Sequence, residues 1–260
     1  MTVITLTTDW VLNDYYVGVV KGAILSGNAG VSIVDITHQI YPFNTAQAAF
    51  VLKNSFSYFP EGSIHIMAVN KMAAREQPEY VVVKQQGHYF IGANDGTLGL
   101  MFDEDDGVVV SIEQFVKAES HIFAALHIFV PVALHLAGGG AMEDLGTVLP
   151  SFKRMTPLLA ITEESVIAGV VIFVDSYQNA ITNIRRDEFE QVQKGRRFEI
   201  VVQSNHYKIN TISKSYNEVS DGELLAVFNS AGLLEIAINR GSAAELLNLG
   251  INSRVRVKFY

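Results

Sequence analysis

The 260-residue chain contains no cysteine, and charged residues make up only 18% of it. The lack of cysteine excludes disulfide scaffolds, thiolate metal sites and cysteine nucleophiles. Long apolar runs are also missing, because Val166–Val174 is about half of the roughly 20 residues that a bilayer-spanning helix needs. The N-terminus has the pattern of a strand and lacks the basic segment of a signal peptide. We therefore expect a cytoplasmic protein.

Basic residues are in the minority, since 19 Lys and Arg stand against 27 Asp and Glu, for a formal net charge of -8. An acidic surface repels phosphate backbones and anionic lipids, so we expect neither nucleic acid nor a membrane as partner. Most of the acidic excess lies within residues 1–155. This distribution favours a cationic ligand for that part, although the acidic run Asp103–Asp106 is equally typical of a solvated turn.

Several common catalytic motifs are absent as well. The chain has no Gly-x-Gly-x-x-Gly, no phosphate-binding loop, no Gly-x-Ser-x-Gly and no His-Glu-x-x-His. These absences exclude classical dinucleotide, nucleoside-triphosphate, serine-hydrolase and zinc-hydrolase sites.

Residues 1–155 alternate strand-like and helix-like segments, which predicts an α/β domain with a mostly parallel sheet flanked by helices. Ligands of such sheets bind beyond the carboxyl ends of the strands. The strand-end residues Asp9, His38 and Asn70 are therefore the first candidates for a site. The expected strands are Val3–Thr8, Val31–Thr37, Ile64–Val69, Tyr80–Lys84, Tyr89–Ile91 and Val108–Ile112, and the expected helices are Tyr15–Ser26, Asn44–Phe59 and His121–Ala137.

Residues 156–260 have a different sequence pattern, in which short predicted strands are separated by turns rather than by long helices. Arg254–Tyr260, for example, alternates with period two, as a half-buried antiparallel strand does. We predict a small all-β barrel domain here, with the boundary in the proline-containing stretch Val148–Leu159.

Two acids flank the first strand-to-helix turn. Asp9 directly follows an apolar strand, where a carboxylate has little structural use and can accept both hydroxyl protons of a ribose diol. Asp14 has two interpretations, as part of the same site or as the N-cap of the next helix. His38 is either catalytic or holds loop backbone, and Phe43 either stacks on a ligand or packs in the core. A calcium site of the nucleoside-hydrolase type would need further acids beside this pair, so we expect no metal ion.

The C-terminal part contains two polar loops. The first, Asp175–Asn183, is rich in Asp, Asn and Thr just after an apolar strand. The second is a pair of small-residue turns, Asn229–Gly232 and Asn239–Ala244, on either side of one strand. Small residues let a ligand approach the backbone closely. These loops suit a carboxylate or a purine edge, although each alone is also typical of an ordinary barrel turn.

Taken together, these segments resemble the S-adenosylmethionine (SAM) hydroxide adenosyltransferase family, whose relatives include fluorinating and chlorinating enzymes. The resemblance covers nearly the whole chain and depends on the order and spacing of its segments. They are Val3–Thr8 with Asp9 and Asp14, Tyr16–Gly18, Lys21-Gly22, Asp35–His38 with Pro42, Phe59–His65, Ile128–Ala137, and the two C-terminal loops.

The resemblance implies a homotrimer with sites at subunit interfaces, no cofactor, and attack of water on C5′ of SAM to give adenosine and methionine. It implies that Asp9 holds the ribose hydroxyls and that Phe43 lines the pocket. It also assigns Asp175 and Ser230 to the methionine amino and carboxylate groups. The ribose and adenine would be framed by Asn179, Asn239, Ser242 and Ala243.

The water site departs from the family pattern. Hydrolytic members carry an Asp-Arg-His trio around the attacking water. Here Asn70 stands at the Asp position, Arg75 is assigned to the Arg position across a two-residue gap, and Ala124 stands at the His position. His121 and His127 lie three residues either side of Ala124 and share a helical face with it. Either could replace the missing histidine, and we take His127 as the candidate.

These patterns predict a SAM-binding protein that hydrolyses SAM through an altered water site. The alternative is a non-catalytic protein that binds or senses SAM or adenosine. A third interpretation, another anion as nucleophile, fits less well because the serine-rich halide pocket of halogenating relatives is not evident in the sequence.

Overall fold

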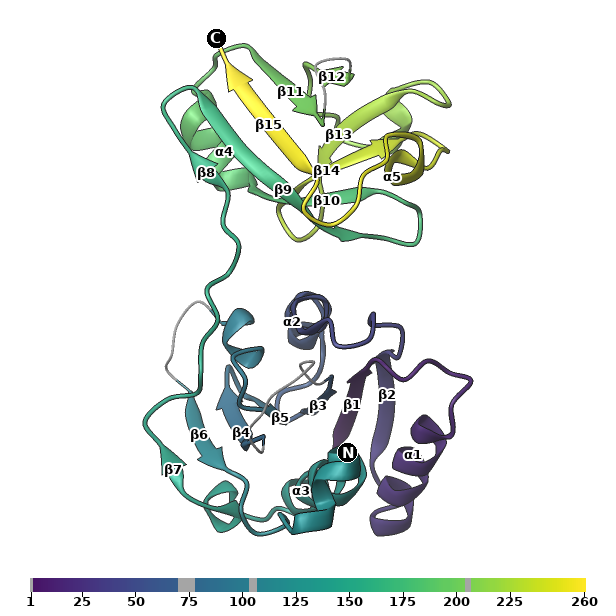
Figure 1. Cartoon of the computed structure of the whole chain (residues 1–260), viewed down its shortest axis with the longest axis vertical. Coiled ribbons are helices and arrows are strands. Elements are labelled where there is room, and N and C mark those ends of the chain that lie inside the picture. Colours follow the sequence, from purple (N-terminus) through teal and green to yellow (C-terminus); the bar gives the residue numbers. More distant parts are fainter. Residues whose placement is uncertain (1, 70–77, 103–106, 204–206) are drawn as a thin grey trace. The chain divides into compact units, whose positions relative to one another are not determined.

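The computed structural model describes residues 2–69, 78–102, 107–203 and 207–260. The chain forms two compact units, Met1–Thr156 and Pro157–Tyr260 (Figure 1). None of the helices in these described ranges is long and apolar enough to cross a membrane.

The N-terminal unit is an α/β structure. Its strands are β1 (Val3–Thr8), β2 (Ser32–Thr37), β3 (Ile64–Ala68), β4 (Tyr80–Gln85), β5 (His88–Ala93), β6 (Val108–Ser111) and β7 (Val148–Leu149). Its α-helices are α1 (Tyr15–Gly27), α2 (Thr45–Lys53) and α3 (Val130–Ala137). Short 3-10 helices are η1 (Phe56–Tyr58), η2 (Leu98–Leu100), η3 (Ala118–Phe123) and η5 (Met142–Leu145), and η4 (Ala125–Phe129) is a π-helix.

The sheet of this unit has the strand order β2-β1-β3-β5-β4-β6-β7. The first four strands run parallel, whereas β4 pairs antiparallel with both β5 and β6, and β6 with β7. The expectation of a mostly parallel sheet is therefore corrected to a mixed sheet. The cause is the two-residue turn Gln86-Gly87, whose φ angles of +50° and +79° join β4 and β5 as a hairpin.

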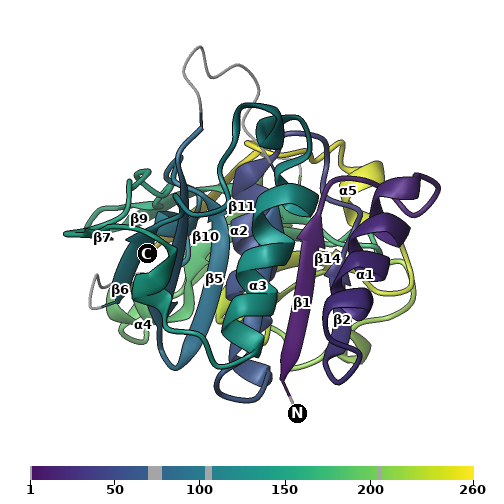
Figure 2. The same cartoon turned by 90° about the horizontal axis from the view of Figure 1, so that it is seen from below.

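Helices cover both faces of the sheet. Figure 2 shows α1 and α3 on one face and α2 on the other. Each face has its own apolar cluster, because strand side chains alternate between faces. Ile4 and Ile66 pack in the cluster that contains Ile24 of α1, whereas Met67 packs in the cluster that contains Leu52 of α2. The central strands β1 and β3 are thus fixed from both sides, and Thr8 pairs with Ala68 at their carboxyl ends.

The C-terminal unit is antiparallel throughout its described strand pairs. Its strands are β8 (Ile161–Thr162), β9 (Val166–Val174), β10 (Ala180–Arg185), β11 (Phe198–Val202), β12 (Tyr207–Ile209), β13 (Leu224–Phe228), β14 (Leu233–Ile238) and β15 (Arg254–Phe259). The helices are α4 (Arg186–Gln193), α5 (Ala243–Leu246) and the 3-10 helix η6 (Tyr216–Glu218).

These strands form a nearly closed, barrel-like sheet in the order β12-β11-β15-β9-β10-β14-β13, with β8 paired to β9. The two end strands, β12 and β13, contact each other. The predicted period-two pattern of the last strand is confirmed, because Val255 and Val257 are buried while Arg254 and Arg256 are exposed. Its buried residues join the enclosed core of this unit.

Candidate functional site

A pocket of about 320 Å³ lies at the carboxyl ends of β1 and β3 in the N-terminal unit. It brings together Asp9, Asp14 and Phe43, which the sequence predicted as ligand-binding residues, and Ala124, which the resemblance assigned to the family's His position. The described lining consists of Asp9, Trp10, Asp14, Tyr16, Pro42, Phe43, Ala68, Ile122, Phe123, Ala124, Ala125 and Phe129.

Asp9 is half-buried immediately after β1. Its Oδ2 accepts a hydrogen bond of 2.9 Å from the backbone N–H of Phe43, which ties the end of β1 to the loop after β2. Burial raises the pKa of Asp9, and the hydrogen bond from Phe43 opposes that shift. Phe43 has a φ of +64°, the left-handed region that is costly for a non-glycine residue. Such strain at a pocket supports a role for this loop in the site.

Asp14 stands at the N-cap of α1, but its exposed side chain makes no capping hydrogen bond. It lines the pocket instead. The ring of Trp10 lies 6.1 Å from that of Tyr16 and 5.6 Å from that of Phe123, so one pocket wall is aromatic. The described lining contains no lysine or arginine. Carboxylates and ring faces together attract cations, and a carboxylate also accepts hydrogen bonds from hydroxyl groups.

His38 is not among the residues described as lining this pocket. It is buried, with Nδ1 2.8 Å from Thr8 Oγ1 and Nε2 3.0 Å from Asp35 Oδ1. Its backbone carbonyl accepts from Val11 N–H, and Lys21 Nζ lies 2.5 Å from Asp35 Oδ2. Of the two interpretations of His38, the structure supports the one in which it holds the loop that carries Asp9.

The predicted water-site residues are placed less favourably. Ala124 is buried in the pocket wall next to the π-helix η4. His127 is exposed, makes an edge contact with the ring of Phe123 and is not among the residues described as lining the pocket. His121 stacks on the Tyr80 ring, with Nδ1 3.3 Å from the hydroxyl. The remaining two candidates, Asn70 and Arg75, lie outside the described residues.

The C-terminal unit has a second pocket, of about 780 Å³. Three predicted residues, Asp175, Asn179 and Ser242, line it together with Tyr216 and Arg240, which sequence reasoning missed. Both polar loops thus contribute to one cavity. The described lining is Asp175, Ser176, Tyr177, Gln178, Asn179, Tyr216, Ile238, Arg240, Gly241 and Ser242.

Asp175 shapes the first loop of this pocket. Its Oδ1 accepts from the N–H groups of Tyr177 (3.0 Å) and Asn179 (2.8 Å), and its Oδ2 accepts from Asn179 Nδ2 (3.1 Å). Gln178 takes a left-handed φ of +63°, and its carbonyl accepts from Ala244 N–H. The two loops are therefore fixed to each other by a backbone bond of 2.8 Å.

Three other predicted residues do not appear in the described lining of this pocket. Asn239 is buried and its Nδ2 donates to the Val219 carbonyl at 2.8 Å, so it anchors the segment before β13. Ala243 is buried at the start of α5. Ser230 is exposed in the turn between β13 and β14.

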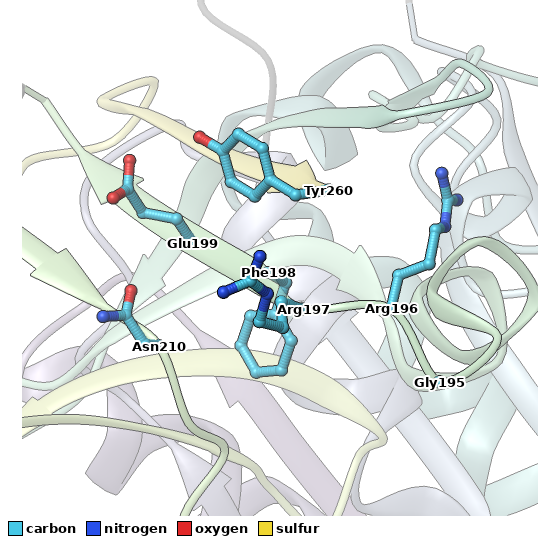
Figure 3. A pocket seen from close by; sticks show the side chains of 7 residues that line it. All are labelled: Gly195, Arg196, Arg197, Phe198, Glu199, Asn210 and Tyr260. Carbon is cyan, nitrogen blue, oxygen red and sulfur yellow. The ribbon is translucent and has the colours of Figure 1, made fainter.

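A third pocket, of about 460 Å³, lies elsewhere in the C-terminal unit (Figure 3). Its charged groups are largely committed to the protein itself. Arg196 donates to the carbonyls of Glu164 and Val192, and Lys208 Nζ lies 3.1 Å from Glu199 Oε2. Figure 3 shows Arg196 extending away from Glu199, and we assign this pocket no ligand.

No group of three or more His, Asp or Glu side chains within the described ranges is arranged to hold a metal ion.

Comparisons with known proteins bear on the two pockets. The model of the SAM hydroxide adenosyltransferase N-terminal domain matches residues 4–146, and that of the C-terminal domain matches residues 169–256. An (R)-S-adenosyl-L-methionine hydrolase of Thermus thermophilus is 30% identical over 96% of this chain and 97% of its own length. One of Methanocaldococcus jannaschii is 28% identical over 99% of this chain and 96% of its own length.

The fold agrees with a solved structure. The crystal structure of an uncharacterized conserved protein from Thermotoga maritima matches with a TM-score of 0.86 and 29% sequence identity, covering 99% of this chain and 100% of that one. The two domain models together cover most of the sequence, in the order in which the two pockets occur. The chain therefore belongs to the SAM hydroxide adenosyltransferase family.

Proposed function

We propose that the protein binds SAM and cleaves its C5′–S bond with water, giving adenosine and L-methionine. The observation that carries this proposal is the acidic, aromatic pocket around Asp9, which has no basic residue in its described lining. A sulfonium nucleoside offers what such a pocket accepts, a positive charge and a ribose diol. The family membership and the hydrolases among the relatives support the same activity.

In this proposal the Asp9 carboxylate accepts hydrogen bonds from the two ribose hydroxyls, and Phe43 closes over the nucleoside. Asp14 adds negative charge at the pocket rim. In the C-terminal pocket, Asp175 takes the methionine ammonium, while Asn179 and the backbone at Ser242 face the nucleoside. Asn239 anchors this pocket rather than touching the ligand, and Ser230 and Ala243 stay proposed contacts of the methionine carboxylate and the adenine.

The reaction needs no acid catalyst for the departure of methionine. A water oxygen forms a bond to C5′ while the C5′–S bond breaks, and the electron pair of that bond returns to sulfur as the neutral thioether of methionine. The water gives up one proton to solvent or to a base. Because the sulfonium is already a good leaving group, the contribution of the protein is to hold the water in line and to exclude competing solvent.

The remaining role in the mechanism is that of the general base, which takes the proton from the attacking water. Ala124 provides only a methyl group in the pocket wall, and the exposed His127 stays a candidate for the role together with Asn70 and Arg75. General-base catalysis is typically worth about 10²–10⁴-fold. We therefore expect slow turnover. The same observation at Ala124 favours a second candidate function, a SAM or adenosine binder without turnover.

We further propose that the protein works as a homotrimer, in which each site takes its N-terminal pocket from one subunit and its C-terminal pocket from a neighbour. Among the described residues, neither pocket alone holds both an acceptor for the ribose and the loops for the rest of the ligand. Sedimentation equilibrium at several protein concentrations tests the assembly, and a monomer with full SAM affinity contradicts it.

The activity is tested by incubating purified protein with SAM and following adenosine and methionine by chromatography, with SAM binding measured by calorimetry. Equal amounts of the two products above the non-enzymatic background, abolished in Asp9→Ala, support the hydrolase. Binding without products supports the second candidate function. Neither binding nor products contradicts both.

A further inference from the structure

Glu235, in the middle of β14, is a buried carboxylate that the proposed reaction does not use. Only 3% of its surface is exposed. Its Oε1 accepts from the Tyr216 hydroxyl at 2.6 Å, and its Oε2 accepts from Asn229 Nδ2 at 3.1 Å. Both partners are neutral donors, so the stabilisation of this charge depends on these two hydrogen bonds.

Glu235 lies on an otherwise apolar face of the sheet. It pairs in register with Val227, and the same face carries Leu225 and Ala237, which form a small apolar cluster with Val219. A carboxylate in such surroundings is costly unless both of its oxygens are satisfied. Its two partners, Tyr216 and Asn229, satisfy one oxygen each.

The geometry favours a carboxylate over an amide. The Asn229 side chain cannot turn over, because its Oδ1 accepts from the N–H groups of Ala231 (3.0 Å) and Leu233 (3.2 Å). Its Nδ2 therefore has to face Glu235 as a donor. Burial and the hydrogen bond and charge of Glu235 raise the pKa of Tyr216 well above the ordinary value, so its hydroxyl stays protonated and donates to the carboxylate. A carboxylate accepts from both groups at once, whereas a glutamine facing Asn229 with its oxygen would turn its amide N–H towards Tyr216 and reverse that hydrogen bond.

The two partners connect Glu235 to the site. Tyr216 lines the C-terminal pocket together with Asp175. Asn229 begins the turn that carries Ser230, which the family resemblance assigns to the methionine carboxylate. One buried charge thus joins a residue that lines the pocket to the turn between β13 and β14.

We propose that Glu235 is a positioning residue, whose carboxylate clamps Tyr216 and the Asn229–Gly232 turn into the arrangement that receives the ligand. The proposal rests on the proposed function in one respect, that this pocket binds SAM. It adds a residue that touches no ligand and acts through two others.

The first test is Glu235→Gln in the full-length protein. Glutamine keeps the size of the side chain but can accept from only one of the two donors. We expect the Kd and KM for SAM to rise about tenfold while kcat changes less than about twofold, because a charge-assisted bond that orders the pocket is lost and the attacking water is not touched. Wild-type affinity in this variant overturns the proposal.

The second test exchanges the acid and the amide between positions 235 and 229, so that donors and acceptors match again. When Glu235→Gln is combined with Asn229→Asp, the introduced glutamine can accept from Tyr216 and donate to the introduced aspartate. The Oδ1 atom of that aspartate still accepts from the two backbone N–H groups. We expect the SAM affinity of the double variant to return to within about threefold of wild type. Asn229→Asp alone should weaken SAM binding, because it places two carboxylates next to each other. A double variant that folds but binds no better than Glu235→Gln overturns the proposal.

Glu199→Gln is the matched control, because Glu199 is a partly buried glutamate of the same unit that lines the third pocket (Figure 3). Its SAM affinity should equal that of wild type. Hydrogen exchange at the Ala231 and Leu233 amides gives a readout that needs no ligand: protection should fall in Glu235→Gln and return in the double variant. If wild-type protein binds no SAM, the proposed function fails while the exchange pattern still decides whether the clamp exists.

Discussion

The two pockets use their carboxylates differently, although Asp9 and Asp175 both follow directly on an apolar strand. Asp175 accepts three hydrogen bonds from its own loop, through both of its oxygens. Asp9 accepts one from outside its own segment, from Phe43 N–H, and its half-buried position raises its pKa. A carboxylate has about four acceptor positions. Asp9 therefore keeps capacity for a ligand, while most of the capacity of Asp175 goes into the shape of the loop.

Asp9→Asn should have the largest effect on binding. The amide still accepts from Phe43 N–H, but it offers the ribose diol a neutral acceptor and a misplaced donor in place of a charged acceptor. Hydrogen bonds to charged groups are worth about 1.5–3 kcal/mol, so we expect about a hundredfold rise in the Kd for SAM, measured by calorimetry.

Asp14→Asn is the control for that experiment. Asp14 lines the same pocket, but it is exposed and forms no capping bond, so its substitution should change the Kd less than about threefold. A hundredfold loss from Asp14→Asn and none from Asp9→Asn would reverse the roles assigned to the two acids.

Acid should destabilise the N-terminal unit before the C-terminal unit. His65 is fully buried, and burial followed by the charge of His88 lowers its pKa from 6.5 to about 3. In the unfolded chain His65 therefore binds a proton below about pH 6.5, whereas in the folded chain it does so only below about pH 3. The stabilisation is complete above pH 6.5 and is lost at about 1.4 kcal/mol per pH unit below it, or about 2 kcal/mol by pH 5.

Urea unfolding at pH 7.5, 6.5, 5.5 and 5 measures this slope, with tryptophan fluorescence as the probe because Trp10 belongs to the N-terminal unit. His65→Gln should be less stable at pH 7.5, since it disturbs the bonds to Thr5 and His88, but its stability should depend less on pH. An unchanged slope in the variant would assign the acid sensitivity to other groups.

Ala124→His should raise turnover by about tenfold, if the missing base limits the reaction. The position lines the pocket, so an imidazole there can reach a bound water, and its effect should grow as pH rises through about 6.5. Ala124→Gln is the control of similar size without a base. A variant that binds SAM with unchanged affinity and gains no turnover would favour the non-catalytic binder.

Much of the architecture could be predicted from periodicity, because the apolar strands of residues 3–8, 32–37 and 64–68 and the alternating strand 254–259 form where their patterns indicate. The antiparallel direction of β4 could not be predicted from periodicity. Its hairpin turns on Gln86-Gly87, and glutamine is not a residue that signals a left-handed position. The break between helices η4 and α3, in a segment predicted as one helix, coincides with Pro131 in the first turn of α3, a local signal that the prediction of one helix did not use.

The site was predictable where a residue follows its own strand and less so where it depends on distant segments. Asp9 and Asp175 stand at strand ends, whereas the bond between Asp9 and Phe43 joins residues 34 apart. Glu235 was missed because a glutamate in a strand is expected to face solvent. Its one sequence signal is that it interrupts the otherwise apolar segment Leu233–Ile238, and the structure shows that another segment covers it.

Asp175→Asn makes in the C-terminal pocket the same change as Asp9→Asn makes in the N-terminal pocket, and we expect a much smaller effect on SAM binding from it. The introduced asparagine can keep both backbone bonds through its Oδ1. It loses only the bond between Oδ2 and Asn179 Nδ2 and the charge that faces the methionine ammonium. We expect about a fivefold rise in the Kd for SAM and little change for adenosine, which has no ammonium. If the two substitutions weaken SAM binding equally, then Asp175 is as free to bind ligand as Asp9, and the bonds within its loop do not limit its function.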